Sequence, residues 1–198
     1  MTVTETTEEL EAAHRERALV GMGLAWWAGR HPDRPAVTSD HGTRTFAELN
    51  AGANRLARAL RARGLGEGDP VALVCTNRPE FAETLFACQR AGFRLTPINW
   101  HLTGDEASYI VTDCGAKAVV ADADLPATLL DAIAVAPAPV KLLVGGSREA
   151  FEPYANVVAR EDGADVPDPV LGTQMLYTSG TTGRPKGVHR SPEVAKAL

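Results

Sequence analysis

Short stretches of strand-forming residues alternate with helical patterns along most of this chain of 198 residues. The clearest stretch is residues 71–75, a continuous apolar run, which predicts a strand buried on both faces. Further strands are predicted at residues 93–98, 117–121 and 140–144. Because helices separate these strands, we expect an α/β fold with a mainly parallel sheet and helices on both of its faces. In such sheets, ligands bind beyond the carboxyl ends of the strands.

The helices between the strands carry start and stop signals. Residues 45–48 and 103–106 are capping boxes, in which a hydroxyl group and a glutamate satisfy free amide groups at the beginning of a helix. The first box is followed by apolar residues on one helical face, at Leu49, Ala53, Leu56 and Leu60. Gly64 ends this helix, because glycine readily adopts the left-handed conformation of a C-terminal cap. Further helices are predicted within residues 77–92 and, less regularly, 124–134.

We divide the chain into a flexible N-terminal lead, residues 1–17, interpreted as a loose or frayed helix, and one incomplete domain, residues 18–198. The domain opens with a predicted short helix within residues 18–30, in which Trp26 and Trp27 are interpreted as packing residues. Prolines follow this helix and stop it, since each proline restricts the residue before it.

Two further segments are assigned from turn residues. Residues 36–38 predict a short strand, with a turn at residues 40–43. Residues 152–172 are rich in Pro, Gly, Asp and Ala, and we interpret them as an irregular connector. The connector leads into a last apolar strand at residues 174–178.

The charge pattern argues against nucleic-acid binding. The net charge is −5, and phosphate neutralisation needs clustered Lys and Arg. The densest basic stretch holds Arg55, Arg58, Arg61 and Arg63. Their spacing of about one helical turn predicts the solvated side of an amphipathic helix.

Cysteine and histidine usage indicates neither a disulfide framework nor a metal centre. Cys75, Cys88 and Cys114 lie in apolar runs without a C-x-x-C spacing, so we expect buried, reduced thiols. The histidines are scattered, whereas metal ligands come in spaced clusters, so we expect no metal site. Asp113 and Asp122 flank the strand at 117–121 and are expected to be solvated.

The apolar runs are too short to cross a membrane, which takes about 20 residues. The first residues are polar and acidic, without the basic start and apolar stretch of a secretory signal. We expect a cytoplasmic protein with no membrane span.

A loop of small and hydroxyl-bearing residues follows the last predicted strand. Its glycines let the backbone approach a ligand closely, and its exposed N–H groups form a concave nest for anions. Its hydroxyl groups can donate to phosphate oxygens, and Lys186 adds a positive charge. The hydroxyl groups belong to Thr178, Ser179, Thr181 and Thr182. Val188 and His189 offer a returning strand, so we predict a strand–phosphate loop–strand unit.

This loop is not a Walker loop, G-x-x-x-x-G-K-[ST]. Counted from Gly180, the sixth position is Pro185 where glycine is required, and Gly187 follows Lys186 where Ser or Thr is required. A flexible polar hairpin without a ligand is the alternative. It does not account for the specific order of ten consecutive positions. His189, just after the loop, is a further candidate to face a bound nucleotide.

Residues 177–188, Tyr-Thr-Ser-Gly-Thr-Thr-Gly-Arg-Pro-Lys-Gly-Val, resemble the signature of the adenylate-forming (AMP-binding) superfamily. Residues 44–50, 64–73 and 91–99 resemble three other stretches of that superfamily in the same order. Residues 94–110 are more similar to fatty-acyl and related acid–CoA ligases than to peptide-synthetase domains. The resemblance covers about residues 20–190.

The resemblance implies an acyl-CoA synthetase. Its substrates would be a carboxylic acid, ATP and CoA, and it would require Mg²⁺. The acid would attack the α-phosphate of ATP to give an acyl-adenylate and pyrophosphate, and CoA would then displace AMP. Positions that match the signature imply these phosphate contacts: Thr178, Ser179, Gly180, Thr181, Thr182, Gly183 and Lys186.

Members of this superfamily are more than twice as long. Their catalytic lysine, magnesium ligand and adenine-binding residues would all lie beyond Leu198, so we expect an N-terminal fragment with little activity alone. Exposed apolar surface where the rest would pack is expected to favour self-association. Two alternatives stay open: a non-catalytic nucleotide-binding or partner-binding fragment, and part of an amino-acid adenylation domain.

Overall fold

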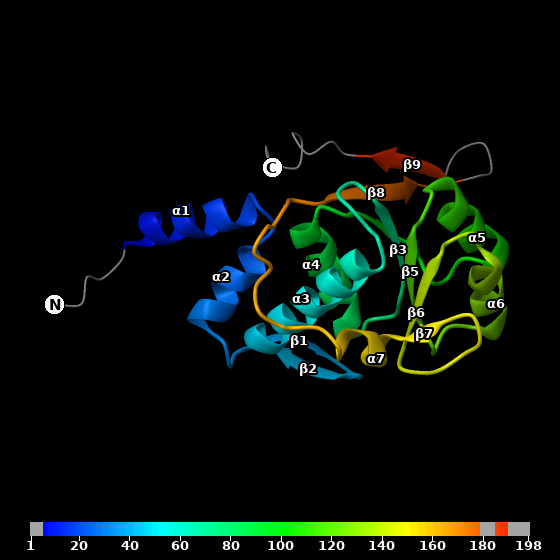
Figure 1. Ribbon diagram of the computed structural model, residues 1–198, viewed down its shortest axis with the longest axis horizontal. Helices are drawn as coiled ribbons and strands as arrows, with labels where there is room; N and C mark the ends of the chain where they lie inside the picture. The colour runs from blue at the N-terminus through cyan, green and yellow to red at the C-terminus, as the bar shows by residue number, and fades with distance from the viewer. Residues whose placement is uncertain (1–5, 179–184, 190–198) are drawn as a thin grey trace.

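The computed structural model describes residues 6–178 and 185–189, and a seven-stranded sheet forms the centre of this part of the chain (Figure 1). The strands are β3 (Pro70–Val74), β4 (Arg94–Pro97), β5 (Ala118–Asp122), β6 (Val140–Val144), β7 (Glu152–Pro153), β8 (Thr173–Thr178) and β9 (Lys186–His189). Their spatial order is β7-β6-β5-β3-β4-β8-β9. All neighbours are parallel except β8 and β9, so the predicted mainly parallel sheet is confirmed.

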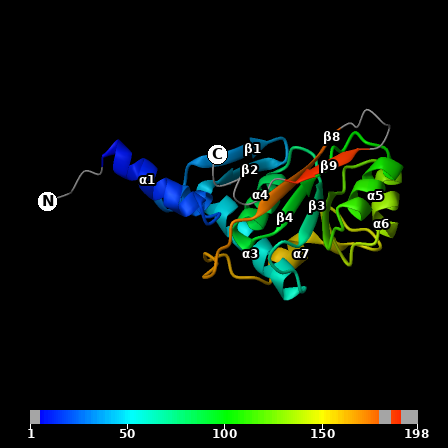
Figure 2. The ribbon, with the colours of Figure 1, turned by 90° about the horizontal axis from the view of Figure 1, so that it is seen from above.

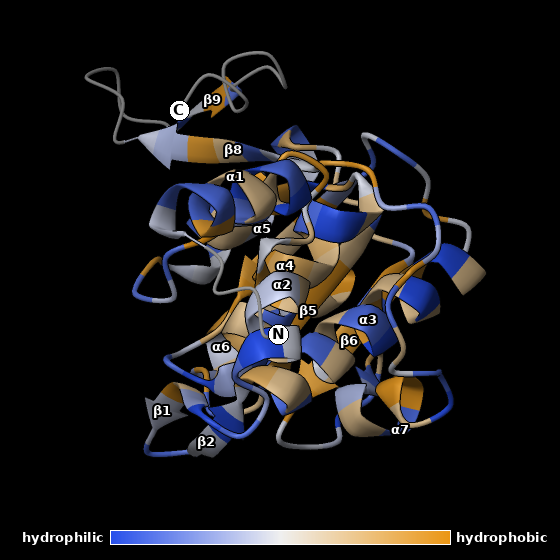
Figure 3. Ribbon diagram, turned by 90° about the vertical axis from the view of Figure 1, so that its left-hand side faces the viewer, coloured by the Kyte–Doolittle hydropathy of each residue, from blue (hydrophilic) through white to orange (hydrophobic). Residues whose placement is uncertain are grey.

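Helices cover both faces of the sheet, as predicted. One face carries α3 (Phe46–Ala62), α4 (Pro79–Ala91) and α7 (Tyr154–Val158), and the other carries α5 (Gly104–Asp113) and α6 (Ala127–Val135). In β3, Leu73 packs into the first apolar layer, whereas Ala72 and Val74 pack into the second. Every residue of β3 is buried. In Figure 3, β5 and β6 are mainly hydrophobic, whereas the helices around them carry both hydrophobic and hydrophilic residues.

The predicted helix ends are confirmed at atomic detail. The Thr45 hydroxyl accepts the Glu48 amide at 3.2 Å, and the Glu48 carboxylate accepts the Thr45 amide at 2.8 Å. The same reciprocal bonds begin α5 at Thr103. Gly92 ends α4 with a φ of 77°, a conformation that L side chains rarely adopt. The three cysteines are free and buried, as expected.

A two-stranded hairpin replaces the predicted single strand and turn near the N-terminus. β1 (Pro35–Ser39) pairs antiparallel with β2 (Gly42–Thr45). The sequence prediction found only the first strand, because Gly42 and Thr43 are turn formers that here also begin the second strand. Ahead of the hairpin, α2 (Gly23–Arg30) buries Leu24 and Ala25. The Trp26 and Trp27 rings pack edge to face, with centroids 4.8 Å apart.

The segment predicted as a flexible lead contains helix α1 (Thr7–Ala18), which begins with a third capping box at Thr6 and Glu9. In two perpendicular views α1 projects away from the body of the protein (Figures 1 and 2). It contacts α2 through the His14 ring, whose centroid lies 5.1 Å from that of Trp26. Flexibility of this lead relative to the body stays a prediction.

The predicted irregular connector is partly structured, since it includes β7 and the short helix α7. Its later residues are bonded to arginines of α3. Arg58 donates to the carbonyl oxygens of Asp162, Ala164 and Asp165 at 2.6–3.1 Å. Arg61 forms an ion pair with Asp168 at 2.8 Å. These arginines lie on the side of α3 that is not buried, as predicted, but Arg58 and Arg61 are only partly exposed. They provide the hydrogen bonds that a chain without secondary structure lacks, a role that the sequence analysis missed.

A buried arginine joins α4 to α3 and the connector. Arg90 is fully buried, and its guanidinium donates to the side-chain oxygens of Asn50 and Asn54. The Asn54 amide donates in turn to Asp165 at 3.1 Å. Burial lowers the pKa of Arg90 to about 10. Neighbouring dipoles accept from Nε and Nη1 of this buried charge, while Nη2 has no hydrogen-bond partner among the described residues.

None of the helices in the described residues is both long and apolar enough to span a membrane.

We expect Asn54→Leu to lower the free energy of unfolding by about 3 kcal/mol, because Arg90 would remain charged and lose a buried acceptor. Urea unfolding measures the loss, with the exposed Arg15→Gln as control. Arg90→Met combined with Asn54→Leu should cost less than the sum of the single changes, by more than about 1 kcal/mol. Additive losses would show that the two side chains do not act together.

Candidate functional site

The β8–β9 hairpin lies at one end of the sheet, where it carries the predicted phosphate loop (Figure 2). β8 runs parallel to β4, with Arg94 opposite Thr173 and Leu95 opposite Gln174. The carboxyl end of β8 therefore lies at the same edge of the sheet as the carboxyl ends of the other parallel strands. This is the edge at which α/β sheets bind ligands. The two strands predicted on either side of the loop are confirmed and pair antiparallel, while residues 179–184 lie outside the described residues.

The register of the hairpin brings together two of the seven predicted phosphate contacts. Thr178 pairs with Lys186 as the last pair before the loop, and both side chains are exposed. The other five candidates lie outside the described residues: Ser179, Gly180, Thr181, Thr182 and Gly183. The threonine and the lysine are thus directly paired residues on neighbouring strands, at the two ends of the loop segment.

The two faces of the hairpin differ in character. Because side chains alternate along a strand, Thr178 and Lys186 share one face with the exposed pair Leu176 and Val188. Met175 and Tyr177, on the other face, pack against the apolar layer of α5 and α6. The candidate phosphate contacts therefore lie on the face that is turned away from α5.

Tyr177, the first residue of the signature, fastens the hairpin to the end of α5. Its hydroxyl donates to the Asp113 carboxylate at 2.5 Å, and Tyr109 donates to the same carboxylate at 3.3 Å. Burial and this hydrogen bond raise the pKa of Tyr177 above its usual value. Asp113 is exposed, as expected, but it has a positioning role that the sequence analysis missed. No local signal could reveal it, because its partner lies 64 residues further along the chain.

Gly187 is required by the close packing of the hairpin. A Cβ atom there would lie 2.1 Å from the Met175 methyl carbon and 3.1 Å from Tyr177 Cζ. Distances below 3.0 Å force a shift, and the aromatic ring has less freedom than the methionine. The glycine after Lys186 thus lets β9 lie flat against the residues that anchor β8.

His189 does not lie next to the loop. It is at the opposite end of β9 from Lys186, where it pairs with Met175. Its Nε2 atom lies 3.4 Å from the Thr173 hydroxyl, at the start of β8. The hypothesis that His189 faces a nucleotide held by the loop finds no support in this register.

The crevice between the carboxyl ends of β3 and β5 is filled by the protein's own side chains. The order of strands reverses here, which is where open α/β sheets commonly bind ligands. Asp122 accepts from Arg78 Nε at 2.9 Å and from the Thr76 amide at 3.3 Å. A Cβ at Gly145 would lie 2.7 Å from Arg78, so the guanidinium also fills the space above β6. The hairpin, rather than this crevice, is the candidate site.

The expectation that Asp122 is solvated was wrong, since it is fully buried. Burial by itself raises the pKa of this carboxyl group. Hydrogen bonds from the Asp124 amide and Thr76, together with the Arg78 charge, outweigh it and hold the pKa of Asp122 below its usual value. The sequence did hold a signal for this cluster, because Thr76 and Arg78 follow β3, and Asp122 stands at the end of β5.

We expect Tyr177→Phe to destabilise the protein by about 1 kcal/mol at pH 7, through loss of the bond to Asp113. Because the folded-state pKa is raised, the contribution of this hydroxyl is present below about pH 10 and is lost as pH rises further. Chemical unfolding from pH 7 to pH 11 should therefore bring the variant and the natural protein closer in stability. A gap that widens at high pH would contradict this role.

The chain shows clear similarity to known proteins. Residues 24–193 match the sequence model of the AMP-binding enzyme family. A fatty acid–[acyl-carrier-protein] ligase of Streptomyces coeruleorubidus is 35% identical over 90% of this chain and 34% of its own length. An indoleacetate–CoA ligase of Aromatoleum aromaticum is 34% identical over 84% of this chain and 34% of its own length.

A solved structure agrees with these relatives. The fatty acyl CoA synthetase of Mycobacterium tuberculosis superposes with a TM-score of 0.74 at 28% identity, over 89% of this chain and 35% of that one. The chain thus spans about a third of the length of each of these proteins. With its matched residues and its parallel sheet ending in the signature hairpin, the chain belongs to the AMP-binding enzyme family.

Proposed function

We propose that this chain is the N-terminal portion of an ATP-dependent acid–thiol ligase, and that its β8–β9 hairpin binds the polyphosphate of ATP. The observation that carries the proposal is the pairing of Thr178 with Lys186 at the mouth of the signature loop. Both side chains are exposed on the face turned away from α5. A lysine and a hydroxyl group beside a glycine-rich loop suit phosphate oxygens.

The proposed reaction has two steps. A carboxylate oxygen attacks the α-phosphorus of ATP, the bond to the β-phosphate bridge oxygen breaks, and an acyl-adenylate and pyrophosphate form. A thiol then attacks the acyl carbon and AMP leaves. Negative charge builds on the leaving pyrophosphate in the first step, so a fixed ammonium group and backbone amides near it would lower the barrier.

The hairpin contributes rigidity to this proposed step. Tyr177 is bonded to Asp113, and the backbone of β8 is bonded to β4, so the stem of the loop is fixed before ATP arrives. A binding group that is already in place needs no reorganisation at the moment of reaction, and this is the source of its catalytic value.

Magnesium is implied by the family resemblance but is not assigned to residues of this chain. In the described ranges, 6–178 and 185–189, no group of three or more His, Cys, Asp or Glu side chains is placed to hold a metal ion. We propose that the metal ligands of the complete enzyme lie outside these ranges.

The acid and the thiol are proposed at the level of class. The relatives are a ligase for fatty acids that uses an acyl carrier protein and a ligase for indoleacetate that uses CoA. We propose a carboxylic acid and CoA for the complete enzyme. The exposed apolar pair Leu176 and Val188 supports a further proposal, that this portion by itself associates through the open face of the hairpin.

Inorganic tripolyphosphate tests the binding proposal directly, because it lacks adenine and ribose. We expect isothermal titration calorimetry to detect binding by the 198-residue chain, and Lys186→Ala to weaken it about tenfold by removing one charge-assisted bond. Lys141→Ala in β6 is the charge-matched control and should leave affinity unchanged. Equal effects of the two changes would reject the loop as the site.

Ligase activity tests whether this portion of the enzyme can catalyse the first step alone. We expect ATP–pyrophosphate exchange with fatty acids to stay at background for this chain alone, even where tripolyphosphate binds, since catalytic groups of the family are expected outside it. Robust exchange would contradict the assignment to an N-terminal portion. Absence of tripolyphosphate binding together with background exchange would favour a fragment with no nucleotide role.

A further inference from the structure

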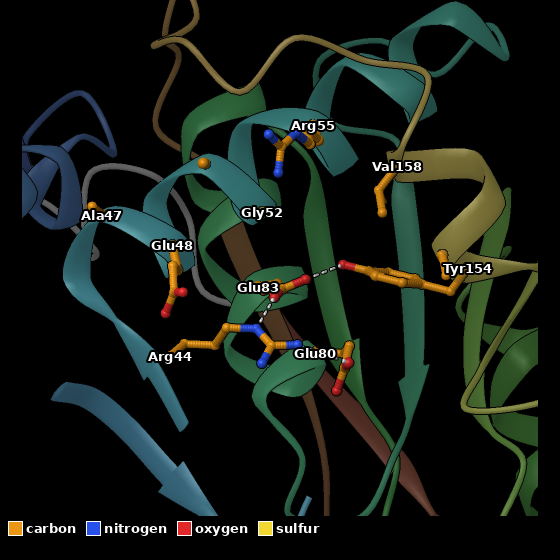
Figure 4. A pocket seen from close by; sticks show the side chains of 11 residues that line it. Arg44, Ala47, Glu48, Gly52, Arg55, Glu80, Glu83, Tyr154 and Val158 are labelled. Carbon is orange, nitrogen blue, oxygen red and sulfur yellow. Dashed lines mark hydrogen bonds and ion pairs between the residues drawn. The ribbon is translucent and has the colours of Figure 1, made fainter. Parts of the chain in front are cut away.

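A cavity of about 550 Å³ lies on the α3–α4 side of the sheet (Figure 4). Its walls come from α3, α4, α7 and the end of β2. No residue of β8 or β9 lines it, so it is separate from the proposed polyphosphate site and does not depend on it. Neither the family match nor the proposed reaction gives this cavity a role.

Small side chains make the space. Ala51 and Gly52 line it from α3, and Ala155 lines it from α7. Gly52 lets the backbone of α3 lie close to Glu83 of α4. A Cβ atom at position 52 would lie only 2.6 Å from the carboxyl carbon of Glu83. The apolar part of the cavity can therefore accept a short hydrocarbon chain.

The centre of the polar wall is already satisfied by the protein. Glu83 is buried and accepts from Tyr154 at 2.7 Å and from Arg44 Nε at 3.4 Å. Arg44 also forms an ion pair with Glu80 at 3.6 Å. Glu83, Tyr154 and Arg44 hold one another in place and have little capacity left for a ligand, whereas Glu80 takes part only through Oε1.

Two groups of opposite charge at the cavity keep hydrogen-bonding capacity that no described residue uses: one oxygen of Glu80 and the guanidinium of Arg55. Glu80 Oε2 is buried and receives no hydrogen bond from the described residues, which is uncommon for a carboxylate oxygen. Arg55 lines the same cavity, and within the described part of the chain it forms no hydrogen bond or ion pair. In Figure 4, Arg55 and Glu80 lie on opposite sides of the space, with Glu83 between them.

We propose that this cavity binds a small zwitterion of the amino-acid class, whose ammonium group donates to Glu80 and whose carboxylate accepts from Arg55. A simple anion would pair with Arg55 and leave Oε2 of Glu80 without a hydrogen bond, and a simple amine would do the reverse. Only a molecule with both charges satisfies both groups, and a short methylene chain between them suits the alanine-lined walls. The bond to Glu80 forms in the buried part of the site, where charges interact more strongly than they do at the exposed Arg55.

Ligands of graded length test the proposal. Thermal unfolding of the chain is followed with glycine, β-alanine, 4-aminobutyrate and 6-aminohexanoate, with butyrate and butylamine as single-charge controls. At ten times its Kd, the zwitterion that fits should raise Tm by about 3–6 °C, and calorimetry gives the Kd. The single-charge controls should bind at least about tenfold more weakly, because each lacks one charge-assisted bond. Equal binding of zwitterion and controls, or no binding by any of the zwitterions, would overturn the proposal.

Variants locate the site. Arg55→Gln and Glu80→Gln should each reduce affinity for the fitting zwitterion about tenfold. Both should fold, because Arg55 has no partner in the described structure and glutamine keeps the shape of Glu80. Ala51→Leu fills the space without altering either charge, so it should abolish binding. This variant replaces a charge variant that does not fold. Arg15→Gln on α1 is the control. Binding that survives both Ala51→Leu and Arg55→Gln would place the ligand elsewhere.

Discussion

The burial of β3 on both faces is the constraint on which the rest of the structure depends. All five of its residues are buried, with alternate side chains in two separate apolar layers. A strand of this kind cannot lie at a sheet surface, so it requires parallel neighbours and a helical layer on each side. Parallel strands in turn end at one common edge. The position of any loop that follows a strand, including the phosphate loop after β8, is set by that rule.

The hairpin needs more than the sheet to fix its position, because the chain reaches β8 only after a long connector. Arg58 and Arg61 of α3 bond to that connector, and buried Arg90 joins it to α4 through Asn54. The carbonyl of Gln89, at the end of α4, also accepts the Gly172 amide at 2.8 Å, just before β8 begins. Tyr177 then fastens the far end of the strand to Asp113. The loop therefore extends from a stem that is held at both ends.

Paired and unpaired polar groups divide the molecule into structural and candidate binding regions. At the reversal of strand order, Asp122 and Arg78 satisfy each other and close the crevice. In the cavity beside α3 and α7, Glu80 and Arg55 keep unused hydrogen-bonding capacity. A general rule for α/β sheets identifies the edge at which ligands bind, but the state of individual side chains decides which part of that edge is open. Unpaired side chains can also mark a candidate site on a helical face, such as the cavity beside α3 and α7, which the rule for sheet edges does not cover.

The sequence by itself determined the features that depend on neighbouring residues. Capping boxes, the glycine that ends α4 and the apolar run of β3 act within a few residues, so they predicted the elements, the fold class and the strand–loop–strand unit. The specific order of the signature predicted the family. Tertiary structure alone decided that Asp122 is buried, that Arg58 bonds to the connector and that Tyr177 reaches Asp113. Their partners lie 44 to 107 residues away along the chain, and only the packing of distant elements brings such groups together.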